Sequence, residues 1–198
     1  MKVATFCFGF LALVGVSVLA GPAPITALQS REEFAAVGQM PSIAGSPMIG
    51  SGATANINIS IDSYSSEEEA RSMAAAFAKG KHTALRKTLQ KASVKARITF
   101  EGRNGSYELK LLRSKTTPNG RQIYGVGERT IRFLDAYYSG RSHLEEFGIL
   151  QLNITKNGDV EEGSGVLIHK AKIKSLDSNS IALDDHGIEP VRLTVRRQ

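Results

Sequence analysis

Hydrophobic and polar residues alternate strictly along several stretches of the chain. From residue 56 onward, Ile57, Ile59 and Ile61 fall on one side, while Asn56 and Asn58 fall on the other. The same alternation returns in residues 94–100, 107–111, 150–154 and 191–195. A period of two residues predicts β-strands with one buried face and one wet face.

The stretch after the first of these strands has a helical period instead. A helix start is predicted at Ser65, with a capping box from Ser65 to Glu68 and glutamates where the helix dipole favours them. Gly80 is expected to end this helix. The apolar stripe that would face inward consists of Ala70, Met73, Ala74 and Phe77.

A second, shorter helix is predicted over residues 83–92. Leu85 and Leu89 lie four residues apart and would be buried on one face. The basic residues of the opposite face would then lie in solvent: Arg86, Lys87 and Lys91.

Three Asn-Gly dipeptides, at residues 104–105, 119–120 and 157–158, separate strand-like stretches. Asn-Gly accommodates the positive φ angles of tight hairpin turns. Clean alternation also favours antiparallel strands, because buried parallel strands read as continuous apolar runs. The predicted fold class is therefore α+β: an antiparallel β-sheet meander with a helix pair inserted after the first long strand and packed on one face.

The first twenty residues have the organisation of a secretory signal peptide. Lys2 precedes an apolar run over residues 3–19, and small residues follow at Ala20 and Gly21. We expect cleavage near Ala20 and a secreted or periplasmic location. The alternative, a membrane anchor, needs about 20 apolar residues. This run is slightly short, so no transmembrane segment is expected in the mature chain.

The remaining chain divides into a lead-in and a domain. Residues 21–52 are rich in Ala, Gly, Ser and Pro and are expected to be flexible, so residues 53–198 would form a single α+β domain. The only cysteine, Cys7, lies in the predicted signal peptide. A mature domain without disulfides is typical of bacterial exported proteins.

Motifs for catalysis and for cofactors are missing from the sequence. It contains no Gly-x-Ser-x-Gly elbow, no phosphate-binding glycine loop and no His-Glu-x-x-His. No cofactor is predicted. Asp184, Asp185, His186 and Glu189 offer oxygen and imidazole ligands, but neighbouring residues of one turn seldom converge on one ion. A polar turn is the preferred interpretation, and no metal site is predicted.

A polar and aromatic loop is expected around residues 135–147. His143 and a carboxylate from Asp135, Glu145 or Glu146 would make a general acid–base pair if they came within hydrogen-bond reach. The candidate ligand-binding residues of the loop are Tyr137, Tyr138 and Arg141. An ordinary surface loop is preferred over a binding loop and over a catalytic site, although loops often carry function.

Basic residues outnumber acidic ones by 25 to 19, a formal charge of +6. Lys170, Lys172 and Lys174 alternate and are candidate ligand-binding residues. Five more occupy outward strand positions: Lys95, Arg97, Lys110, Arg192 and Arg196. If these strands adjoin, a basic face would attract an anionic envelope polymer or lipid headgroups. The alternative is a solvated surface whose lysines prevent edge pairing. Nucleic acid is not expected, because no aromatic residues interleave these positions.

Four segments resemble a family of small secreted bacterial proteins of unknown function. They are residues 59–69, Gly140-Arg141-Ser142, Leu150-Gln151-Leu152-Asn153 and Glu189-Pro190-Val191-Arg192-Leu193. The resemblance covers roughly residues 48–198. It implies a bacterial exported domain and brings no activity, ligand or catalytic residue with it.

Two functions of different classes follow from the sequence. The favoured one is a non-enzymatic binding module that holds an envelope component or a partner protein on its sheet face or on the 135–147 loop. The alternative is a hydrolase or isomerase of unrecognised type that uses this loop.

Overall fold

The computed structural model describes residues 31–39, 54–131, 146–184 and 189–198, which form eleven strands and one helix. The strands are β1 Glu32–Gln39, β2 Thr54–Ile61, β3 Ala96–Phe100, β4 Ser106–Leu109, β5 Leu111–Thr117, β6 Gly120–Val126, β7 Phe147–Asn157, β8 Val160–Ala171, β9 Ile173–Leu176, β10 Ile181–Leu183 and β11 Val191–Arg197, and the helix is α1 Glu67–Lys91. Nine strands form one sheet in the order β4-β3-β2-β1-β11-β8-β7-β6-β5, while β9 and β10 form a separate hairpin.

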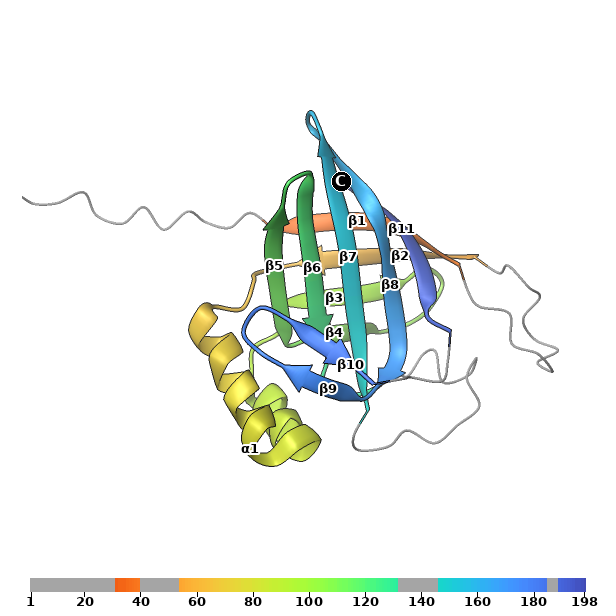
Figure 1. The fold of residues 1–198 in the computed structure, drawn as a ribbon. Coiled ribbons are helices and arrows are strands. Elements are labelled where there is room, and N and C mark those ends of the chain that lie inside the picture. The colour runs from red at the N-terminus through yellow and green to blue at the C-terminus, as the bar shows by residue number, and fades with distance from the viewer. Residues whose placement is uncertain (1–30, 40–53, 132–145, 185–188) are drawn as a thin grey trace, which may run out of the picture.

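The large sheet curls into a nearly closed antiparallel barrel. Its two outermost strands, β4 and β5, are consecutive in the chain and are separated only by Lys110. β4 pairs with β3 and β5 pairs with β6, so this bent segment belongs to both ends of the sheet. At the bend, the N–H of Lys110 donates to the carbonyl of Val126 at 2.9 Å. Figure 1 shows β1–β3 crossing the direction of β5–β8.

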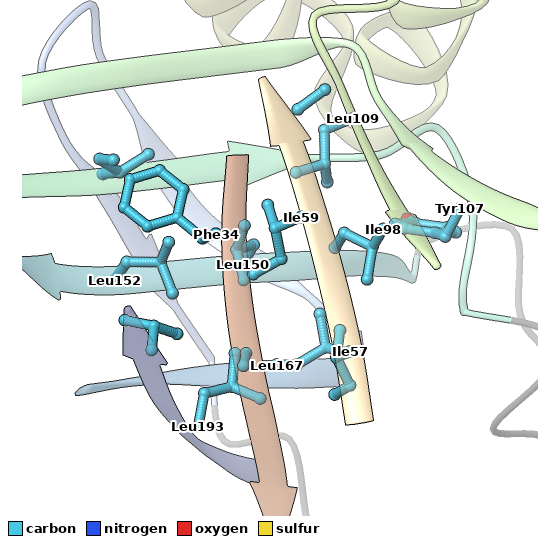
Figure 2. Close-up of a cluster of buried hydrophobic side chains, with 14 of the residues drawn as sticks. Phe34, Ile57, Ile59, Ile98, Tyr107, Leu109, Leu150, Leu152, Leu167 and Leu193 are labelled. Atoms are coloured by element: carbon cyan, nitrogen blue, oxygen red, sulfur yellow. The ribbon is translucent and has the colours of Figure 1, made fainter. Parts of the chain in front are cut away.

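The inward face of the barrel is filled by side chains from all parts of the sheet. Alternate residues of each strand point inward, such as Phe34 on β1, Ile59 on β2 and Leu152 on β7 (Figure 2). These three side chains are each 1% exposed. Burial of this apolar surface is the main force that holds the barrel together.

A second apolar cluster lies outside the barrel, between the sheet and α1. Phe77, Leu85 and Leu89 of α1 belong to the same buried cluster as Tyr124 of β6 and Phe147 of β7. These strand residues alternate with the inward ones, so β6 and β7 are buried on both faces. The β9–β10 hairpin covers the same side, as Figure 1 shows.

The start of α1 differs by one residue from the predicted capping box. Ser66 is the N-cap: its hydroxyl accepts from the N–H of Glu69, and the Glu69 carboxylate accepts from the N–H of Ser66 at 2.7 Å. Ser65 is buried instead, and its hydroxyl accepts from the N–H of Leu112 at 3.1 Å. Ser65 therefore joins the start of the helix to the barrel.

The predicted helix pair is wrong, because the structure has one helix with a kink. The kink lies at Gly80 and Lys81, where Lys81 has φ +51°. Gly80 interrupts the regular helix as expected, but one element runs on from Glu67 to Lys91. Gly80 and Lys81, whose φ and ψ are not helical, therefore divide this one element into two helical segments without a loop between them.

The predicted α+β meander is also wrong, since the protein is mostly β with a barrel-like sheet. β1 carries much of this difference. Residues 32–39, assigned from sequence to the flexible lead-in, form a strand between β2 and β11. The alternation pattern tells which face of a strand is buried but carries no information about sheet curvature or closure.

The antiparallel sheet and the three hairpins are confirmed. β3 pairs with β4, β5 with β6, and β7 with β8. Gly105 and Gly158 in the turns, and Gly120 at the start of β6, have positive φ.

Tyr107 is buried in the barrel interior, and Gly148 leaves space for its hydroxyl. The hydroxyl donates to the carbonyl of Arg129. A Cβ atom built on Gly148 would lie 2.5 Å from this hydroxyl and 2.5 Å from Cγ1 of Ile131. We expect Gly148→Ala to lower the free energy of unfolding by about 1–3 kcal/mol in urea titrations, because this core has no room for a methyl group.

Two matched controls are Tyr107→Phe alone and Tyr107→Phe combined with Gly148→Ala. If the hydroxyl causes the conflict, Gly148→Ala costs less in the Tyr107→Phe background than alone. Equal costs in both backgrounds would assign the conflict to Ile131 instead.

Candidate functional site

A groove of about 880 Å³ crosses the outer face of β2, β1, β11 and β8. Thr155 and Asn157, from the tip of the β7–β8 hairpin, line one side, and Glu101, directly after β3, lines the opposite side. We call this surface the outer groove.

Strand register sets the floor and walls of the outer groove. Ala35 of β1 pairs with Asn58 on one side and with Arg196 on the other. Val37, two residues along, lies between Asn56 and Thr194 in the same way. Neighbouring strands are about 4.8 Å apart, so the two rows of wall residues stand about 10 Å apart.

The floor is apolar because Ala35 and Val37 are the outward residues of β1, whose inward residues Phe34 and Ala36 fill the barrel. Val37 is 45% exposed, which is unusual for a large hydrophobic side chain here. A narrow apolar floor between two hydrogen-bonding walls suits a ligand that lies along β1.

Some polar side chains of the lining already form hydrogen bonds within the protein, and others do not. Asn56 Nδ2 donates to Glu101 at 2.5 Å, and Asn157 Nδ2 donates to Glu162 at 3.5 Å. The exposed guanidinium of Arg196 makes no ion pair or hydrogen bond with any residue that the structure describes. Arg196 is thus the wall cation available to a ligand.

A second polar constellation lies at one end of the barrel and is internally compensated. We call Glu32, Tyr64, Arg121, Glu161 and Arg197 the barrel-end cluster. Arg121 contacts Glu32 at 2.7 Å and Glu161 at 2.8 Å, and Arg197 contacts Glu161 at 2.8 Å. Arg121 also donates to the Tyr64 hydroxyl at 3.1 Å. Two cations and two carboxylates balance one another there.

The ionisation of these groups reflects that pairing. Burial acts to raise the pKa of Glu161, but the hydrogen bond from Arg197 and the charges of Arg121 and Arg197 outweigh it and lower the pKa. Burial likewise acts to lower the pKa of Arg121, and the hydrogen bond to Glu32 outweighs it. Burial raises the pKa of Tyr64. All these shifts favour the charge states that hold the cluster together.

The candidate residues of the 135–147 loop lie mostly outside the described residues. This applies to Asp135, Tyr137, Tyr138, Arg141, His143 and Glu145. Glu146 is described, and its backbone carbonyl accepts from Arg86 at 2.8 Å.

Arg86 does not face solvent as predicted. Its guanidinium also donates to the carbonyl of Glu128 at 2.6 Å and lies 4.9 Å from the ring centroid of Phe147. Burial lowers the pKa of Arg86. Arg86 therefore ties α1 to the two chain segments that flank the predicted loop.

The three candidate lysines do not share one strand. Lys170 is half-buried near the end of β8, Lys172 is exposed between β8 and β9, and Lys174 is exposed on β9.

Four of the five other predicted basic positions, all except Arg196, form ion pairs or hydrogen bonds with nearby residues. Lys95 is buried and pairs with Glu69 at 2.8 Å, Arg97 pairs with Asp62 at 2.6 Å, and Arg192 pairs with Glu189 at 3.0 Å. Lys110 donates to the carbonyl of Ala92 at 3.3 Å.

The described ranges contain neither a metal-binding cluster nor a membrane-spanning helix. Within them, the side chains of His, Cys, Asp and Glu form no group of three or more that could hold a metal ion. Of the predicted polar turn, Asp184 and Glu189 are described, whereas Asp185 and His186 are not. The described helix is not apolar enough to cross a membrane.

Sequence reasoning found the walls of the outer groove but missed the groove. It placed Asn56, Asn58 and Arg196 at outward positions, which the structure confirms. It missed Ala35 and Val37, because small residues in an Ala- and Gly-rich stretch give a weak alternation signal.

The fold and the site define a class: an antiparallel β-barrel with a filled interior and an exterior groove. Comparisons with protein-family models, with curated proteins and with solved structures gave no match.

Proposed function

We propose that the protein is an exported, non-enzymatic binding module whose outer groove holds an extended segment of a partner protein. The observation that carries the proposal is the register across β1, which sets hydrogen-bonding side chains on both sides of the Ala35–Val37 floor. The barrel interior is filled by its own side chains, so the exterior is the surface that can bind.

The chemistry of the walls favours a polypeptide. The amides of Asn56 and Asn58 combine donors and an acceptor, as peptide groups do. The guanidinium of Arg196 matches a carboxylate in a two-point contact. The described lining has no aromatic ring on which a sugar would stack. The ligand is therefore an extended peptide with an acidic side chain or a terminal carboxylate beside Arg196.

The alternative reading as a hydrolase or isomerase has less support. Among its four candidate catalytic residues only Glu146 is described, and the contact that involves its backbone carbonyl is a structural one with Arg86. An anionic envelope polymer or a lipid headgroup would respond to charge alone, which the experiment below separates from peptide recognition.

The test is a selection from a phage-displayed library of random peptides on the purified protein, followed by calorimetry with the selected peptides. We expect acidic peptides, and we expect Arg196→Glu to weaken their binding at least about tenfold through loss of the charge contact. The matched control is Arg192→Glu, four residues away on the same outward face of β11 and outside the groove lining.

The control variant should bind the selected peptides as the unmodified protein does. Equal weakening by both substitutions would show that net charge, not the groove, governs binding. A selection without peptide binders, together with salt-sensitive binding of polyanions, would also overturn the proposal.

A further inference from the structure

The three Asn-Gly dipeptides share one intrinsic reactivity but lie in different surroundings. The backbone nitrogen of the glycine can attack Cγ of the asparagine, which expels the side-chain nitrogen as ammonia and closes a succinimide ring. Water then opens the ring at either imide C–N bond, giving aspartate or isoaspartate. The reaction needs a backbone free to bring the nitrogen onto Cγ.

Asn104 and Gly105 have that freedom. Both lie outside the strands, between β3 and β4, and both are exposed. Gly105 has φ +97°, and apart from its two chain neighbours no residue has an atom within 4 Å of the place where its Cβ would be. In the described part of the chain, the side chain of Asn104 and the N–H of Gly105 make no hydrogen bond.

The Asn119–Gly120 dipeptide is held on both sides. Gly120 is a strand residue that pairs with Thr117 of β5 and with Thr155 of β7. The carbonyl of Asn119 accepts from the N–H of Lys156 at 3.1 Å. Attack by the Gly120 nitrogen would require this end of the barrel to open.

The Asn157–Gly158 dipeptide is held on one side. Asn157 is the last residue of β7 and pairs with Val160 of β8. Its side-chain nitrogen donates to Glu162 at 3.5 Å. Closure of the ring therefore costs a ladder contact and a side-chain contact, neither of which restrains Asn104.

We propose that Asn104–Gly105 is a site of spontaneous deamidation and backbone isomerisation in the folded protein, ahead of the two other Asn-Gly turns. The reaction consumes one water and releases one ammonia, and it needs no oxidant, cofactor or enzyme. The glycine N–H gives up its proton before attack, so the rate rises with pH.

The product changes the charge and the backbone at the rim of the outer groove. Asn104 belongs to the same turn as Glu101, which lines one side of the groove and accepts from Asn56. Deamidation adds a second carboxylate to this turn, and isoaspartate inserts an extra methylene into its backbone. This inference stands on the turn itself and does not depend on what the groove binds.

The experiment is incubation of the purified protein in mildly alkaline buffer, followed by proteolysis and mass spectrometry of the three peptides over time. We expect Asn104 to deamidate at least about tenfold faster than Asn119 and Asn157, which corresponds to an opening cost of about 1.4 kcal/mol at the restrained sites. The products at Asn104 should include isoaspartate, which separates from aspartate by chromatography.

Two controls assign the effect to the fold. In concentrated urea the three rates should become similar, because the dipeptides are identical once the chain is unfolded. Asn104→Gln should remove the fast product and leave the two slow ones unchanged. Equal rates in the folded protein, or faster reaction at Asn119 or Asn157, would overturn the inference.

Discussion

Replacing Phe34 by alanine is expected to lower the free energy of unfolding by about 3–5 kcal/mol, as truncation of a large buried aromatic residue does. Phe34 is 1% exposed and points from β1 into the barrel interior (Figure 2). Arg121 lies over its ring, 5.8 Å from the centroid. The substitution removes apolar burial and also leaves a cavity beside a charged group. Urea titration followed by circular dichroism measures the change.

Val37→Ala on the same strand is the matched control. Val37 points outward and is 45% exposed, so its truncation should cost less than about 0.5 kcal/mol. The contrast between the two variants tests the placement of β1 in the barrel. If residues 32–39 were a flexible lead-in, Phe34→Ala would be as harmless as Val37→Ala, and the barrel described here would be contradicted.

The same strand marks the limit of what the sequence predicts about the fold. β2 was predicted because Ile57, Ile59 and Ile61 alternate with polar residues over its whole length. β1 has Phe34 as its only large apolar inward residue, since Ala36 and Gly38 share that face and contribute little hydrophobic signal. Its identity as a strand comes from its two neighbours, which satisfy its backbone groups.

The alternation of hydrophobic and polar residues did not predict closure of the barrel either. It depends on the bend at Lys110 and on pairing between residues far apart in the chain, such as Phe34 with Arg197. Local features fared better: the three hairpin turns and the helix start at residues 65–67 follow from residue types that act on their nearest neighbours. Even there, Ser65 and Ser66 are chemically equal candidates for the cap, and the contact of Ser65 with Leu112 decides between them.

For the candidate site, alternation predicted which side chains face outward but not which of them meet. Asn58 and Arg196 are far apart in the sequence, and only the insertion of β1 between β2 and β11 brings them to the two walls of one groove. The basic face was predicted on the assumption that the basic strands adjoin. In the sheet, β2, β1 and β11 separate Arg97 of β3 from Lys170 of β8.

The barrel-end cluster supports the second large expected effect, from Arg121→Met. This substitution leaves Glu32 and Glu161 facing each other with only Arg197 to compensate them, and both carboxylate side chains are 15% exposed. Removing one partner of a poorly solvated ion network leaves an uncompensated charge, so we expect the free energy of unfolding to fall by about 3 kcal/mol at neutral pH. Arg71→Met is the control, because Arg71 pairs with Glu67 on the surface of α1 at 70% exposure and should cost less than about 0.5 kcal/mol.

The pH dependence of these variants tests the electrostatic origin of the effect. In the unmodified protein the pKa of Glu161 is lowered, so its pairing stabilises the fold above the unfolded-state pKa, and this contribution is lost as the pH falls through the lower folded-state pKa. In Arg121→Met, by contrast, protonation of an uncompensated carboxylate stabilises the folded variant, because it removes the unpaired charge. The stability gap between the two proteins should therefore narrow between neutral pH and about pH 4.5, near the unfolded pKa of glutamate.

A gap that stays constant with pH would assign the cost of Arg121→Met to lost packing on Phe34 rather than to charge. Adding Glu161→Gln to Arg121→Met separates these causes directly. If the uncompensated carboxylate is responsible, the double variant is more stable than Arg121→Met alone at neutral pH, because a neutral amide is cheaper to bury than an unpaired carboxylate. The recovery of stability should be partial, because Glu161→Gln also removes the ion-pair partner of Arg197. A double variant that is no more stable than Arg121→Met would contradict the ionic origin of the effect.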